Sequence, residues 1–214
     1  MTPILTLDVH RLRGFVRGLT DFQVQPRNGA CYAHIGATIC DTVLQAGLNY
    51  RTVVAPRVQR VICRWPSATR SSRFLAMISR HGLNDVLLWK HPEKPTRIGQ
   101  FTEFLVGQRI ETEDELSEWL TDDENSQSLR ELRGVGPKTV DYLKSLVGLP
   151  AVAVDRHVRT FAAWAGVTAT SYDHIRQIVC EVADSLQLER RAFDHAIWSY
   201  VSTLQNLPRS TRAA

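Results

Sequence analysis

The sequence has no long apolar run, so it predicts no membrane-spanning helix and no membrane partner. Residues 1–10 also lack the basic-then-apolar pattern of a secretory signal, which favours a cytoplasmic protein. No CxxC pair occurs among the four cysteines, Cys31, Cys40, Cys63 and Cys180. Their spacing argues against a structural zinc site and a disulfide framework, and it favours buried, reduced thiols.

Alternating strand patterns are also scarce, whereas apolar residues recur at helical spacing along most of the chain. Short Gly or Pro segments separate the periodic stretches, which lie near 6–19, 30–46, 51–64, 69–80, 95–107, 112–120, 126–132, 137–147, 156–165, 171–186 and 190–203. The fold class that we expect is therefore all-α.

The net charge is +4, and the charged residues are unevenly distributed along the sequence. Seven arginines and no acids lie between Arg51 and Arg80, and eight acids and no bases lie between Glu111 and Glu124. The basic stretch is suited to a polyanionic partner, but two solvated helix faces explain the pattern equally well.

The most informative segment is Leu132-Arg133-Gly134-Val135-Gly136-Pro137-Lys138-Thr139-Val140, between two helical patterns. Gly134 and Gly136 permit a tight turn, and Val135 between them can pack into the core. Pro137 occupies the first helical position, where its missing N–H does no harm. Free backbone N–H groups at the positive end of the following helix suit a DNA phosphate.

This string, L-x-G-V-G-x-K-T, is the helix-hairpin-helix pattern, and it predicts a DNA contact through Gly134, Val135, Gly136 and Thr139. The pattern does not by itself indicate an enzyme, because many proteins use the hairpin only to grip DNA. A helix–Gly–helix corner without a ligand is the structural alternative.

Downstream of the hairpin the chain resembles the endonuclease III branch of the helix-hairpin-helix glycosylases, most strongly over residues 129–165. In that branch the hairpin is followed by a lysine, a helix and an apolar run that ends in Val-Asp. Here G-V-G-P-K-T precedes a helix and then Ala151-Val152-Ala153-Val154-Asp155-Arg156-His157. The resemblance implies that Lys138 is the nucleophile and that Asp155 is the catalytic carboxylate. We interpret Arg156, the next residue, as a DNA contact or a structural contact.

The spacing allows Lys138 and Asp155 to meet. The helix that starts at Lys138 is roughly 14 Å long. The eight residues from Gly148 to Asp155 can span about 20 Å when extended, which is enough to bring Asp155 back to Lys138. The first turn of a helix lowers the pKa of a lysine and favours an aspartate anion at the cap position. A phosphate-binding role for Lys138 and a capping role for Asp155 remain the structural alternatives, and His157 is more typical of a structural residue.

The function that the resemblance implies is base-excision repair by a bifunctional DNA glycosylase and AP lyase. The damaged nucleotide is flipped out of double-stranded DNA, Lys138 forms a Schiff base with the sugar, and Asp155 stabilises the developing charge. Two alternatives are open: a monofunctional glycosylase in which Asp155 activates water, and a non-enzymatic DNA-binding module. We expect a monomer. The lesion is not readable from the sequence.

The chain departs from endonuclease III in one respect. Only Cys180 follows Asp155, so the four-cysteine iron–sulfur cluster is excluded on ligand count, and we expect no cofactor. The resemblance allows a monovalent cation at the hairpin. Aromatic packing should hold the C-terminal helices together, through Trp164, Phe193, Trp198 and Tyr200. Residues 91–97 should meet DNA.

The architecture that follows is two helical subdomains with a DNA-binding cleft between them. Residues 30–149 would form a helical barrel that ends in the helix-hairpin-helix, with the hairpin at 132–140. Residues 1–29 and 150–214 would form the second subdomain from both ends of the chain.

Overall fold

The computed structural model describes residues 3–27 and 29–206, and every regular element among them is helical. The elements are α1 (Pro3–Gly18), α2 (Ile35–Leu44), the π-helical turn η1 (Tyr50–Val54), α3 (Ala55–Arg64), α4 (Ser71–His81), α5 (Leu83–Leu87), α6 (Glu93–Gly107), α7 (Glu113–Trp119), α8 (Asp123–Leu129), α9 (Pro137–Leu146), α10 (Arg156–Trp164), α11 (Tyr172–Ser185) and α12 (Arg190–Asn206). The all-α prediction is confirmed.

The chain divides into two compact units. Unit 1 comprises Met1–Asn28 and Pro150–Ala214, and unit 2 comprises Gly29–Leu149. That these units are subdomains on either side of a DNA-binding cleft stays a prediction.

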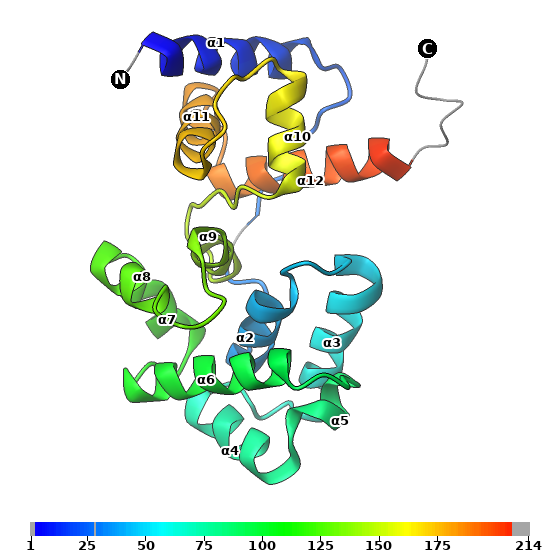
Figure 1. Cartoon of the computed structure of the whole chain (residues 1–214), viewed down its shortest axis with the longest axis vertical. Helices are drawn as coiled ribbons and strands as arrows, with labels where there is room; N and C mark the ends of the chain where they lie inside the picture. The colour runs from blue at the N-terminus through cyan, green and yellow to red at the C-terminus, as the bar shows by residue number, and fades with distance from the viewer. Residues whose placement is uncertain (1–2, 28, 207–214) are drawn as a thin grey trace. The chain divides into compact units, whose positions relative to one another are not determined.

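Helix α2 is the central helix of unit 2, and all ten of its residues are buried. His34 caps its N-terminus, because His34 Nδ1 accepts a hydrogen bond from the Ala37 N–H at 3.1 Å. Gly36 permits close approach of α4, since a Cβ at this position would lie 2.7 Å from the ring of Phe74. Helices α3, α4, α6 and α9 pack around α2 (Figure 1). This burial fixes the position of the α2 C-terminus, near which two lysines bind.

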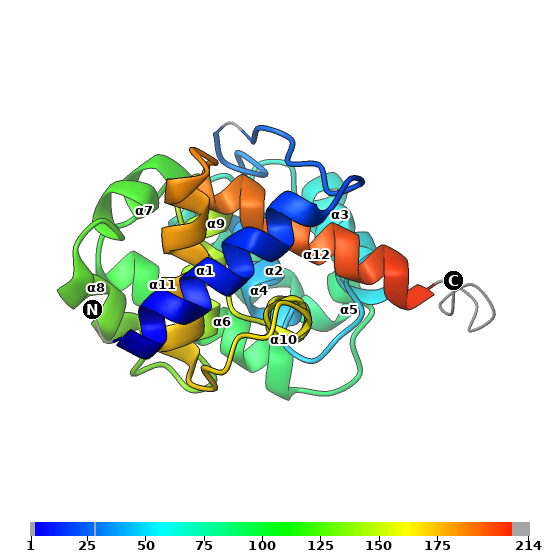
Figure 2. The same cartoon turned by 90° about the horizontal axis from the view of Figure 1, so that it is seen from above.

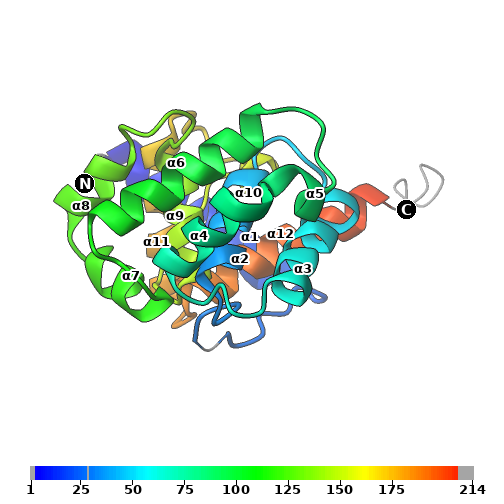
Figure 3. The same cartoon turned by 90° about the horizontal axis from the view of Figure 1, so that it is seen from below.

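Helix α7, in the acidic stretch, is capped locally and is joined to the core of unit 2 by a buried hydrogen bond. Thr112 begins α7 with a capping box, in which its hydroxyl and the Glu115 carboxylate each accept a backbone hydrogen bond. The next residue, Glu113, is buried and accepts a hydrogen bond from the Thr38 hydroxyl on α2. Helix α4, which carries part of the basic stretch, lies beside α6 (Figure 3).

Unit 1 is built from both ends of the described chain. Helix α1 packs along α11, and α10 packs on α12 (Figure 2). The ring of Phe161 is fully buried and stacks on Phe22, with 5.3 Å between ring centroids. Asp8, also fully buried, accepts hydrogen bonds at 3.0 Å from the backbone N–H groups of Thr168 and Ala169. These bonds tie α1 to the segment that follows α10.

Each helical stretch expected from the sequence overlaps a helix, and the differences have simple causes. Helix α5 was not expected, because five residues are too few to show a periodicity. Helix α2 begins at Ile35 and not at residue 30, because its cap is His34 and not one of the residues that usually mark a helix start.

Two expectations about single side chains are wrong. Cys31 and Cys63 are exposed, although Cys40 is buried as expected. Cys63 lies two positions after buried Val61 on α3, which places it on the opposite side of the helix from the core. Among the expected aromatic contacts, Phe193 is fully buried but Trp164, the last residue of α10, is 44% exposed.

A search of the described helices finds none with the length and apolar character needed to cross a bilayer.

Candidate nucleic-acid interface

The hairpin of unit 2 turns at Gly134 and leads directly into α9. Gly134 has φ of +84°, in the left-handed region that favours glycine. Gly136 is the N-cap of α9 with extended backbone, and Pro137 takes the first helical position. The Val135 N–H donates to the Leu132 carbonyl at 3.0 Å, and the Val135 side chain packs against the core of unit 2. The glycine and proline roles that the sequence indicates are therefore present.

The backbone N–H groups of Gly134 and Gly136 have no acceptor within the described residues, and neither does that of Arg133 beside them. Gly134 is exposed and Gly136 is half-buried. No side chain caps the N-terminus of α9, where the helix dipole is positive. Amides in this position suit an anion such as a phosphate. Thr139 differs, because its side chain is buried and its N–H donates to the Gly136 carbonyl at 2.9 Å.

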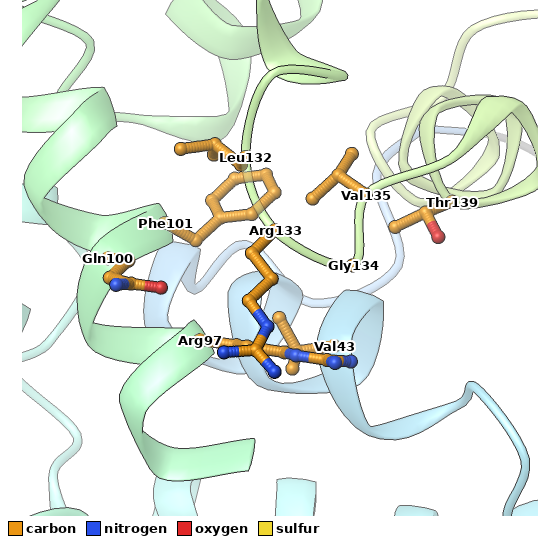
Figure 4. Close-up of a pocket in the computed structure, with 9 residues that line it drawn as sticks. All are labelled: Val43, Arg97, Gln100, Phe101, Leu132, Arg133, Gly134, Val135 and Thr139. Carbon is orange, nitrogen blue, oxygen red and sulfur yellow. The ribbon is translucent and has the colours of Figure 1, made fainter. Parts of the chain in front are cut away.

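Two arginines lie beside the hairpin in a small hollow of unit 2. Arg97 of α6 and Arg133 both point into this hollow, with Gly134 above them (Figure 4). The guanidinium of Arg97 lies so close to Gly134 that a Cβ there would be 2.6 Å from Nη1. Arg97 also forms an ion pair with Glu93 at 2.7 Å, and Glu93 is 60% exposed. The hairpin amides are thus accompanied by positive charge from a second element.

Lys138 is half-buried in the first turn of α9. Its Nζ donates a hydrogen bond to Gln45 Oε1, the residue that follows α2, at 2.8 Å. A second lysine, Lys94 of α6, reaches the same end of α2 and donates to the carbonyls of Val43 at 2.7 Å and Ala46 at 3.1 Å. Burial and the positive charges of Arg97 and Lys138 lower the pKa of Lys94, although Glu93 opposes that shift. Two ammonium groups therefore converge on residues 43–46.

A buried carboxylate lies one helical turn away from this pair of lysines. Asp41 accepts hydrogen bonds from the hydroxyls of Tyr32 and Tyr142, the latter at 3.0 Å, and from Tyr50 at 3.4 Å. Burial raises the pKa of Asp41 to about 6, and the three tyrosine hydrogen bonds oppose that rise. Tyr142 follows Lys138 by one turn and Asp41 precedes Gln45 by one turn, so α2 and α9 are joined by two polar contacts in succession.

Asp155 belongs to unit 1, where it is the N-cap of α10. Asp155 Oδ1 accepts hydrogen bonds from the backbone N–H groups of His157 at 2.7 Å and Val158 at 3.0 Å. Its second oxygen, Oδ2, lies 2.8 Å from His157 Nδ1. Asp155 is half-buried, and Arg156 is exposed. The predicted capping role is present, and it leaves the proposed catalytic role untested.

The contacts of His157 were not expected. His157 is buried, and its ring meets Trp198 edge to face, with 6.1 Å between centroids. Trp198 in turn stacks on His195. These rings fix His157 beside Asp155, so the carboxylate has a defined orientation within unit 1.

The predicted site residues fall into two sets. Unit 2 holds Gly134, Val135, Gly136, Lys138 and Thr139, which share one turn and the helix that follows it. Unit 1 holds Asp155 and Arg156. The pairing of Lys138 with Asp155 stays a prediction.

Sequence reasoning missed Lys94 and the tyrosines around Asp41. Lys94 contacts a residue 51 positions away and Tyr142 one 101 positions away, and no local pattern marks such pairs. Tyr32 and Tyr50 each lie nine positions from Asp41, outside its helix. The one available signal was the expectation that residues 91–97, which include Lys94 and Arg97, meet DNA.

Seven arginines of the basic stretch lie on η1, α3, α4 and the segment between α3 and α4, and all but Arg57 are exposed. Arg57 packs over the ring of Trp89. Arg70 approaches Glu111 with 3.6 Å between Nε and Oε2, so the basic and acidic stretches are in contact at one point. Within residues 3–27 and 29–206, no group of three His, Cys, Asp or Glu side chains could hold a metal ion.

The described chain is thus a helical protein whose glycine hairpin combines unsatisfied amides with a cluster of basic side chains. It belongs to the family described as "Domain of unknown function (DUF8548)", whose model matches residues 90–202, slightly more than half of the chain. The matched segment includes Lys94, the hairpin, Lys138 and Asp155, but not α2. No curated protein matches the chain.

Proposed function

We propose that this protein is a helix-hairpin-helix DNA glycosylase with AP lyase activity, which excises a damaged base from double-stranded DNA. The hairpin is the observation that carries the proposal. Its Gly134 and Gly136 amides have no acceptors and lie at the positive end of α9, beside two arginines. A half-buried lysine, Lys138, follows directly. A phosphate bound there would place the DNA backbone next to Lys138.

Lys138 is the nucleophile in this proposal. Its neutral amine attacks C1′ of the flipped nucleotide, the new N–C1′ bond forms, and the bond to the base breaks with the base taking the electron pair and a proton. Loss of a proton from the nitrogen and opening of the sugar give an imine, from which elimination breaks the strand. The hydrogen bond to Gln45 supports this role, because it gives the Lys138 amine a fixed orientation.

Asp155 is the electrostatic partner in this proposal. Its carboxylate is held by two backbone N–H groups, and it can stabilise the positive charge on the sugar as the base leaves. That role requires Asp155 to face the sugar in the complex, where His157 would hold the carboxylate in one orientation.

Trapping with borohydride tests the proposal. Duplexes that carry an oxidised pyrimidine, 8-oxoguanine, uracil or an abasic site are incubated with the protein and borohydride, and covalent protein–DNA adducts are resolved by electrophoresis. Lys144→Gln is the matched control for Lys138→Gln, because Lys144 lies on the same helix and makes only a 3.7 Å ion pair with a fully exposed carboxylate, that of Asp123.

An adduct that is lost in Lys138→Gln and kept in Lys144→Gln supports the bifunctional enzyme. Base release without any adduct contradicts the lyase step and indicates a monofunctional glycosylase. DNA binding with neither adduct nor base release on any of these duplexes contradicts the enzyme and indicates a binding module.

A further inference from the structure

Arg97 of α6 has more hydrogen-bond donors than acceptors in the free protein. Its side chain is half-buried, and among the described residues only its Nη2 has an acceptor, Glu93 Oε1 at 2.7 Å. The Nε atom of Arg97 is buried and has no partner. Every nitrogen of a guanidinium is a donor, and a buried donor without an acceptor costs free energy. Arg97 therefore has donors available for a further acceptor.

The Arg97 guanidinium lies against the hairpin, in the space that a side chain at Gly134 would occupy (Figure 4). A Cβ on Gly134 would be 2.6 Å from Arg97 Nη1 and 2.9 Å from Nε. The N–H groups of Gly134 and Arg133 have no acceptor within the described residues, and the Arg133 side chain lines the same hollow. Gly134 therefore has a second role besides the turn, because its missing side chain lets a cation from α6 approach the hairpin amides.

The ion pair between Arg97 and Glu93 is one that another anion can replace. The two residues are four positions apart on α6, and Glu93 is 60% exposed. Exposed pairs at this spacing are weak, because water solvates both partners. The Arg190–Asp184 pair of unit 1 differs, since Asp184 accepts from Arg190 Nε at 2.9 Å and from Nη2 at 2.6 Å. Glu93 uses only one donor of Arg97 and leaves the others unbound.

We propose that Glu93 is an internal substitute for a phosphate: it binds Arg97 in the free protein, and a phosphate of bound DNA displaces it from the guanidinium. Arg97 then binds, from α6, the same anion that the amides of Gly134 and Gly136 bind from the hairpin. A guanidinium suits this role because its parallel donors match two phosphate oxygens. The inference rests on the proposed function for its ligand, DNA, but it requires no chemistry at Lys138.

Fluorescence anisotropy of the full chain with a labelled, undamaged duplex tests this exchange. We expect Arg97→Gln to weaken binding about tenfold and to lower the slope of log K against log salt by about one. Arg97→Lys should restore the slope but not the full affinity, because an ammonium group keeps the charge and lacks the planar pair of donors. Glu93→Gln should strengthen binding about threefold, because it removes the competing carboxylate. Wild-type affinity in Arg97→Gln overturns the proposal.

The double variant Glu93→Gln/Arg97→Gln separates competition for Arg97 from simple repulsion between Glu93 and DNA. If Glu93 competes for Arg97, Glu93→Gln gains little affinity once Arg97 is absent. Asp184→Asn is the matched control, because it removes the same charge from the acidic partner of an arginine in unit 1. An equal gain with and without Arg97 overturns the proposal. A gain no larger than that of Asp184→Asn overturns it as well.

Inorganic phosphate gives a second measurement on the wild type, which decides even if a variant does not fold. In ¹⁵N-labelled protein, added phosphate should shift the amide signals of Gly134 and Gly136 together with the Arg97 Nε–H signal, with one dissociation constant. Shifts of the glycine signals without that of Arg97, or no shifts at all, overturn the proposal. If the trapping assay gives no adduct while the phosphate and duplex results are as expected, the lyase is refuted and this inference holds.

Discussion

The two glycines of the hairpin provide a matched pair of substitutions, of which only one is expected to reduce stability. Gly134 has φ of +84°, and a Cβ there would lie 2.6 Å from the Arg97 guanidinium. Gly136 has φ of −106°, and a Cβ there would meet nothing within 4 Å. The substitutions are chemically identical and two residues apart, so their difference isolates backbone conformation and contact.

The cost of Gly134→Ala follows from these two observations. An L-residue in the left-handed region costs about 1–2 kcal/mol. The clash adds less, because the atoms involved belong to the end of a flexible side chain, which can turn toward solvent with loss of the Arg97–Glu93 pair. For a chain of this size 1 kcal/mol corresponds to roughly 2–4 °C in Tm. Gly134→Ala should therefore lower Tm by about 2–8 °C.

Gly136→Ala should change Tm by no more than about 1 °C, because any residue can adopt the φ angle of Gly136. It should nevertheless weaken DNA binding, since a methyl group would stand next to an amide that we propose to hold a phosphate. Thermal unfolding of the free protein and fluorescence anisotropy with labelled duplex measure the two effects separately. If Gly134→Ala is as stable as the wild type, or if Gly136→Ala binds DNA with full affinity, the account of the hairpin fails.

Three further predictions concern other parts of the molecule. The pKa of Asp41 in the folded protein, about 6, exceeds its ordinary value of 3.8. Between these two pH values the folded state therefore holds a proton that the unfolded chain has released. The free energy of unfolding of the wild type should therefore fall by about 2 kcal/mol relative to Asp41→Asn as pH rises from 4 to 7. Parallel pH curves from denaturant titrations would contradict this. Asp155→Ser keeps an acceptor for the α10 cap, so the free energy of unfolding should change by less than about 1 kcal/mol. The rate of base release should nevertheless fall by orders of magnitude, and full turnover in Asp155→Ser refutes a catalytic carboxylate. DNA affinity should drop steeply between about 50 and 200 mM salt, and Arg64→Gln should lower the slope of log K against log salt by about one; a flat response in the wild type excludes an extended phosphate interface.

The helices were predictable because their signals are local. Periodic apolar residues and Gly or Pro breaks recur within each turn, so α9 and α10 were expected within a residue or two of their observed bounds. The hairpin was predictable for the same reason, since Gly134, Gly136 and Pro137 each have a conformational role that depends only on the residue itself.

The surroundings of Lys138 were not predictable in this way. Gln45 is 93 residues from Lys138, and Lys94 reaches back 51 residues to Val43. Neither side chain lies in a motif, and the polar contacts depend on how α6 and α9 pack on α2. Asp41 shows the same limit, because an aspartate in an apolar helix suggests a surface position. Hydrogen bonds from Tyr142, 101 positions away, and from Tyr32 and Tyr50, each nine positions away, allow it to be fully buried.

The hydrogen bonds that Asp8 accepts from the backbone N–H groups of Thr168 and Ala169 have a consequence for the order in which the protein folds during synthesis. Unit 2 is continuous in sequence and can begin to fold once Leu149 has left the ribosome. Helix α1 is made first, but its partner α11 is made more than 150 residues later. Until then the apolar face of α1, with Leu12 and Val16, has no counterpart. Helix α1, although it is made before unit 2, is therefore among the last segments to fold, and it is the segment that a nascent-chain chaperone would be expected to protect.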